Sequence, residues 1–147
     1  VKGFAEKVFP QVRTACPEAR FYIVGGKPAE AVRALASNAV IVTGRVDDVR
    51  PYLQHAVAAV APMRIARGIQ NKVLEAMAMA RPVVLSPEAA TGIAARDGEQ
   101  FVIADADAAF VAALVRLAQD KAEASRMGQA AREFVLAQQS WTAMLVV

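Results

Sequence analysis

The chain has 147 residues, which is the size of one compact domain, so two independent cores are not expected. Hydrophobic residues make up 56% and charged residues 21%, a composition that builds a core and excludes intrinsic disorder. Lys and Arg number 17 against 14 Asp and Glu, and these cations are scattered, so the net charge of +3 does not predict a nucleic-acid-binding surface.

Three other classes of protein are not expected. Pro, Arg or Asp interrupts every apolar run before it reaches the roughly 20 residues of a membrane-spanning helix. The first residues also lack the basic start and small-residue cleavage site of a secretory signal. Cys16 is the single cysteine and His55 the single histidine, which excludes an internal disulfide and a cysteine–histidine metal cluster.

Helical and strand-like patterns alternate along the chain. The apolar residues Phe4, Val8, Phe9 and Val12 have the three-and-four spacing of an amphipathic helix over residues 4–13. After this helix the sequence predicts, in order, strand 20–24, helix 28–36, strand 40–43, a helix capped by Asp47 and ending near 55, strand 57–61, helix 71–80, strand 82–85, strand 100–103, and helices 107–118 and 121–137.

Apolar strands separated by helices of about ten residues predict the fold class, a doubly wound α/β domain with a parallel sheet covered on both faces. A right-handed crossover needs a strand on each side of its helix, so the helix over 4–13 is expected to follow a strand upstream of residue 1. Without that strand, open sheet edges are expected to favour a homodimer. The apolar end at 145–147 suggests that the natural chain also continues there.

The loop and helix between the third and fourth apolar strands carry the candidate chemistry. Gly68 lies in a loop that leads into a helix N-terminus, where free N–H groups and the helix dipole favour phosphate. Arg64, Arg67 and Lys72 add cations around this loop. Glu75 follows Lys72 by one turn, so both side chains are predicted on one helix face. A diphosphate beside a ribose with paired hydroxyls suits this layout.

At this segment the chain resembles a known family. Residues 71–84, Asn-Lys-Val-Leu-Glu-Ala-Met-Ala-Met-Ala-Arg-Pro-Val-Val, resemble the donor-binding segment of retaining glycosyltransferases of family four, in the carboxy-terminal domain of their GT-B fold. Residues 21–26 resemble the strand and glycine loop of that domain, and 42–46 its strand and turn near the nucleotide base. The segment 64–72 is similar to bacterial sugar transferases associated with exopolysaccharide gene clusters.

The resemblance implies roles for individual residues. The family motif is a Glu, seven intervening residues and a second Glu; Glu75 matches the second, which implies a contact to the donor ribose. Arg67 stands at the position of the first, a departure from the motif that leaves sugar handling open. We hypothesise that Arg67 and Lys72 hold the diphosphate and stabilise charge on the leaving group, with no metal cofactor. The predicted donor-binding set is Arg45, Arg64, Gly68, Gln70, Asn71, Lys72 and Glu75.

The resemblance implies that residues 1–147 are the donor-binding, Rossmann-like half of a retaining GT-B glycosyltransferase, inactive without its acceptor-binding domain. Its partners are a nucleotide-diphosphate sugar and a glycan or lipid-linked acceptor, and its expected place is the bacterial cytoplasm or the inner membrane face. Two alternatives are a nucleotide-sugar epimerase and a non-catalytic interaction module with a degenerate site. Lys72 and Glu75 are alternatively a surface ion pair, and Arg45 a solvated turn residue.

Overall fold

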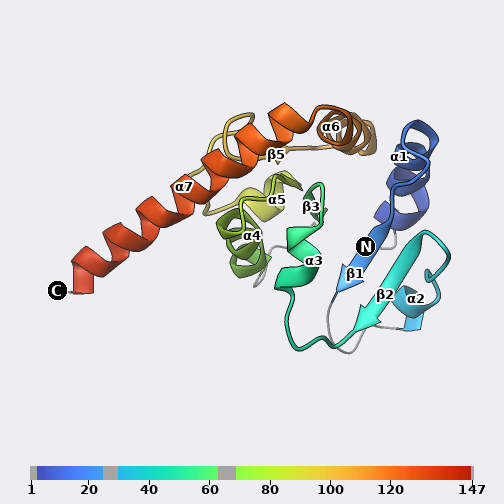
Figure 1. The fold of residues 1–147 in the computed structure, drawn as a ribbon, viewed down its shortest axis with the longest axis horizontal. Helices are drawn as coiled ribbons and strands as arrows, with labels where there is room; N and C mark the ends of the chain where they lie inside the picture. The colour runs from blue at the N-terminus through green and yellow to red at the C-terminus, as the bar shows by residue number, and fades with distance from the viewer. Residues whose placement is uncertain (1–2, 25–29, 63–68, 147) are drawn as a thin grey trace.

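The computed structural model describes residues 3–24, 30–62 and 69–146, with side chains described for 3–24, 30–62 and 72–137. Helices and strands alternate along the chain, as the patterns predict (Figure 1). The elements are the π-helix η1 (Phe4–Val8), α1 (Phe9–Ala15), β1 (Phe21–Val24), α2 (Glu30–Arg33), β2 (Val40–Gly44), α3 (Arg50–Gln54), β3 (Ala59–Ala61), α4 (Ile69–Ala78), β4 (Val83–Leu85), α5 (Pro87–Ala90), β5 (Val102–Ile103), α6 (Asp107–Gln119) and α7 (Lys121–Val146).

All strand pairs are parallel, which confirms the α/β class. The strands form two sheets, β1-β2 and β3-β4-β5, where the sequence predicted one sheet. Within the described residues β1 and β3 do not pair. A doubly wound sheet has the order 3-2-1-4-5-6, and leaving out its strand 1, at the switch point, produces these two groups. The strand expected upstream of residue 1 and the homodimer through open edges stay predictions.

One apolar layer is shared by both sheets. The Phe4 ring lies 4.9 Å from the Phe21 ring of β1 and 6.0 Å from the Phe110 ring of α6. Val60 of β3 and Val84 of β4 pack in the same cluster. Because η1, α1 and α6 contribute to a core that reaches both sheets, this layer joins the two halves of the domain.

A second apolar cluster covers the other face of the three-stranded sheet. It joins Met77 of α4, Leu85 of β4, Phe101 and Ala131 of α7, each at most 1% exposed. Helices α4, α5 and α7 therefore form the layer on this face. The position of α4 depends on this cluster, because its buried side chains leave only the opposite helix face to solvent.

The first predicted helix is present but begins in π geometry. It continues to Ala15, two residues beyond the predicted end. Pro10 follows the π segment, in the first turn of α1. Proline has no N–H to donate and its ring clashes with the carbonyl four residues earlier, so a regular α-helix through Pro10 is disfavoured. The wider π turn before it accommodates the proline inside a continuous helical segment.

Two predicted helices have different ends in the structure. Of the helix predicted over 28–36, residues 28–29 lie outside the described residues, and α2 ends at Arg33 because Leu35 and Ala36 donate to carbonyls only three residues back and tighten the chain into a turn. The prediction that Asp47 caps the next helix is wrong. Asp48 instead accepts the Arg50 N–H and binds the Arg50 guanidinium, and α3 begins at Arg50.

Two further differences concern the second half of the chain. Helix α5 was not predicted, because four residues are too few to show helical periodicity. Its local signal is the Ser86–Pro87 pair: Ser86 Oγ accepts the Ala89 N–H at 3.2 Å, and proline suits the first helical turn. Helix α7 continues to Val146, beyond its predicted end at residue 137, since Ala, Gln, Leu and Met all favour helix.

Candidate functional site

Helix α4 carries four of the predicted site residues, Gln70, Asn71, Lys72 and Glu75. It follows β3, and the loop residues 63–68 between them lie outside the described residues. Val73, Ala76 and Met77 are buried against the sheet and α7, with at most 3% of each exposed. Lys72 and Glu75 are exposed. The apolar spacing of the helix thus directs its polar residues outward.

Lys72 and Glu75 lie three residues apart on the exposed face of α4, as the sequence predicted. The alternative interpretation was a surface ion pair. In the part of the chain that the structure describes, the four ion pairs join other residues, so Lys72 and Glu75 do not neutralise each other. A cation and a carboxylate on one face are therefore available to a ligand that carries both anionic groups and hydroxyl donors.

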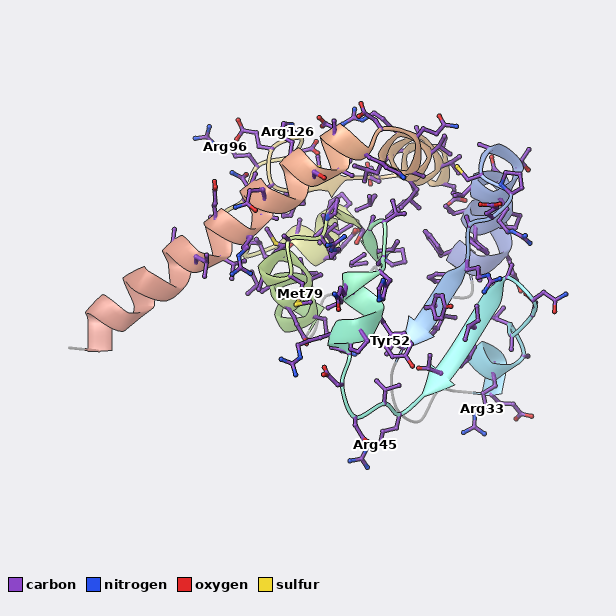
Figure 2. All side chains as sticks on the ribbon, viewed as in Figure 1. Arg33, Arg45, Tyr52, Met79, Arg96 and Arg126 are labelled. Atoms are coloured by element: carbon purple, nitrogen blue, oxygen red, sulfur yellow. The ribbon has the colours of Figure 1, made fainter. Side chains whose placement is uncertain are left out.

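The remaining predicted residues fall into three groups. Gln70 and Asn71 lie in the first turn of α4, beside Lys72. Arg45 follows Gly44, whose φ of +68° ends β2 in a turn that suits glycine, and its exposed side chain projects away from the domain (Figure 2). Outside the described residues lie Gly25, Gly26, Arg64, Arg67 and Gly68.

A hollow of about 530 Å³ lies between α3 and the C-terminal end of α4. The sequence did not indicate it, because its lining comes from elements far apart in the chain. The Arg81 guanidinium donates to the backbone oxygen of Ala56 at 3.3 Å, which connects α4 to the segment after α3. The residues that line the hollow are Asp48, Arg50, Pro51, Gln54, Met79 and Arg81.

The hollow is distinct from the predicted phosphate site. Its arginines already have acceptors: Arg50 pairs with Asp48 at 3.0 Å, and Arg81 binds backbone oxygens. A ten-residue helix is about 15 Å long, and the hollow lies at the end of α4 opposite to its N-terminus. The helix end that favours phosphate is thus remote from the hollow.

The sequence model of the family described as "Glycosyl transferases group 1" matches residues 1–120. The chain belongs to this family. The match includes every strand and α4 with Lys72 and Glu75, and it ends before α7. Among curated proteins, no match to the chain was found.

Neither a metal site nor a membrane-spanning helix is found in the described part of this glycosyltransferase domain. No three or more His, Cys, Asp or Glu side chains gather as a possible metal site within the described residues. Among the same residues, no helix is both long and apolar enough to cross a membrane.

Two carboxylates paired with arginines make the stability of the glycosyltransferase domain dependent on pH. Hydrogen bonds from the Arg50 side chain hold the pKa of Asp48 below its ordinary value, and those from Arg126 do the same for Glu123. A carboxylate whose pKa is lowered in the folded state stabilises that state at pH values above its pKa in the unfolded chain, near 4. This stabilisation is lost as the pH falls through the lower pKa of the folded state.

We therefore expect the thermal unfolding midpoint to fall as the pH is lowered from about 5 to below the folded pKa values of these groups. The double variant Asp48→Asn, Glu123→Gln should show a smaller fall, because its side chains at these positions do not titrate. Thermal scans at a series of pH values measure the effect. An equal fall in the parent and the double variant contradicts this assignment.

Proposed function

We propose that this glycosyltransferase domain binds a nucleotide-diphosphate sugar and transfers its sugar, with retained anomeric configuration, to a glycan or lipid-linked acceptor. The acceptor is bound by a second domain outside this sequence. One observation carries the proposal: Lys72 and Glu75 are exposed on one face of α4, without pairing to each other, in a chain of the group 1 family.

Each part of the donor is assigned to a different part of the site. The N–H groups and positive dipole end of α4 favour the diphosphate, and Lys72 adds a positive charge in the first turn. Glu75 accepts hydrogen bonds from the ribose hydroxyls. An ionised carboxylate suits this role because it has acceptors only and no donor of its own. The proposed set is completed by Arg45 at the base and by Arg64, Arg67, Gly68, Gln70 and Asn71 around the phosphates.

Arg67 stands where the family motif has its first carboxylate, so we assign it to the leaving group and not to the sugar. In this proposal Arg67 and Lys72 stabilise the negative charge that develops on the nucleoside diphosphate as the glycosidic bond breaks. This is the electrostatic role expected where no metal ion is available to stabilise the charge. Donor affinity is then expected to be the same with and without EDTA.

Calorimetric titration of the chain with UDP, GDP and ADP tests the donor site. We expect saturable binding of one diphosphate and a loss of about tenfold in Glu75→Ala, because charged hydrogen bonds contribute about 1.5–3 kcal/mol. The matched control is Glu133→Ala, an exposed helical glutamate of α7, which should bind as the parent does. Sugar transfer is not expected from this chain alone.

The other outcomes distinguish the alternatives. A parent chain that binds none of the three diphosphates contradicts the donor site, and absence of binding by the full-length protein as well favours a non-catalytic interaction module. Product analysis with the full-length protein separates transfer from epimerisation of the sugar. Because nucleotide sugars are made in the cytoplasm, we place the reaction there or at the inner membrane face.

A further inference from the structure

Helix α7 begins at Lys121, directly after the family match ends at residue 120, yet it packs against α4. Its Ala131 and Val135 are buried in the same cluster as Met77 of α4, and its Met127 is buried in the apolar layer shared by both sheets. Figure 1 shows α7 running beside α4 and then continuing beyond the rest of the fold. The surface against which α4, the proposed donor-binding helix, packs is therefore provided partly by a segment that the family match does not include.

Gly128 brings α7 into backbone contact with the end of α4. A Cβ at this position would lie 2.8 Å from the carbonyl carbon of Ala80 and closer still to its oxygen. Real Cβ atoms do not approach backbone this closely, so a larger residue would separate the helices. Ala80 has a φ of +57°, the left-handed conformation in which helices commonly end. Glycine at 128 thus allows α7 to rest on the turn that terminates α4.

Arg132 makes a second contact, one turn further along α7. Its Nη1 donates to the backbone oxygen of Ala78, the last residue of α4, at 2.7 Å. The last carbonyls of a helix have no partner within the helix, and a cation at this end also interacts favourably with the helix dipole. The last turn of α4 is further closed by the Arg81 N–H, which donates to Ala76 O at 3.1 Å.

We propose that α7 fixes the position of α4 along its axis through Gly128 and Arg132, and that Arg132 is a positioning residue for donor binding. The inference rests on the proposed function, because it concerns where α4 presents Lys72 and Glu75. A shift at the last turn is passed to Glu75, whose backbone oxygen accepts the Met79 N–H at 3.2 Å. Misplacement of binding groups by about 1 Å is enough to weaken their action strongly.

Titration with UDP, GDP and ADP tests the positioning role in Arg132→Ala. We expect about fivefold weaker binding of the diphosphate that the parent binds, equivalent to about 1 kcal/mol of lost helix-end interaction. Arg132→Lys keeps the cation and should restore most of the affinity. The matched control is Arg126→Ala, which also removes an arginine-to-backbone hydrogen bond from α7, at Gly98 O (3.1 Å) and not at α4.

Hydrogen exchange without ligand supplies a second readout. Arg132→Ala should speed exchange at the amides of Met79, Ala80 and Arg81, which close the last turn of α4, and Arg126→Ala should not. This measurement does not depend on nucleotide binding, so it tests the contact between α7 and α4 even in a chain that binds no donor.

The outcomes separate this inference from the proposed function. If the parent binds a diphosphate and Arg132→Ala binds it equally well, the positioning role is overturned and the donor site stands. Equal weakening in Arg126→Ala also overturns it, since the loss then reflects general destabilisation. If the parent binds none of the three probes, the proposed function fails; unchanged exchange then overturns the contact with α4, and faster exchange supports it.

Discussion

Lys72→Ala is expected to weaken binding of the nucleoside diphosphate by about 10- to 100-fold and to leave binding of the matching nucleoside nearly unchanged. Lys72 is exposed in the first turn of α4, where its charge and the helix dipole act on the same anionic group. A charged hydrogen bond to phosphate contributes about 1.5–3 kcal/mol, which converts to this range of affinity. Calorimetric titration with both ligands measures the difference.

Two controls identify the phosphate as the group that Lys72 binds. Lys121→Ala removes an exposed lysine at the start of α7 and should not change the affinity for diphosphate. The parent should also lose affinity as salt is added, and Lys72→Ala should lose less, because one screened contact is absent. Equal weakening of nucleoside and diphosphate binding in Lys72→Ala would show that the residue acts on the helix and not on phosphate.

Met77→Ala is expected to lower the free energy of unfolding by about 2–5 kcal/mol, the usual cost of emptying a buried methionine site. The Met77 side chain is 0% exposed and packs in the cluster that joins α4, α7 and the three-stranded sheet. The cavity would lie between three elements that have other contacts in this cluster, which limits collapse around it. Equilibrium unfolding in urea measures the loss.

Met79→Ala is the matched control, because Met79 lies two residues further along and is only half-buried beside the hollow. Its loss should be about 1 kcal/mol or less, since less apolar surface returns to water. Figure 2 labels this residue at the end of α4. Equal losses in the two variants would contradict the packing of α4 described here, because the apolar face of the helix would then be misassigned.

Local sequence patterns were sufficient for most of the secondary structure. Runs such as 21–24 and 82–85 are rich in apolar residues and bounded by turn or polar residues, and their strand character is a property of neighbouring side chains. The exposed positions of Lys72 and Glu75 were predictable for the same reason, because helical spacing alone separates them from Val73 and Met77. The family match over 1–120 confirms the resemblance that pointed to a glycosyltransferase.

Local competition explains the errors at element ends. Asp47 and Asp48 are adjacent and residue type alone does not separate them; in the structure Val49 is the N-cap residue of α3, and Asp48 accepts the Arg50 N–H and pairs with its guanidinium. The sequence predicted one amphipathic helix through Pro10, whereas the structure has a π turn before the proline, in which Phe4 and Val8 pack in the core. Such choices differ by small energies, so the surrounding contacts determine them.

The sequence thus predicted the class of the fold, the order of its strands and helices, and the outward face of α4, because each depends on residues close together in the chain. The division into two sheets and the packing of α4 against α7 depend on contacts between residues far apart in the chain. Arg132 binds a carbonyl 54 positions away, and Gly128 meets the turn at Ala80. No local periodicity records such contacts, since they follow from the packing of whole elements around the shared core.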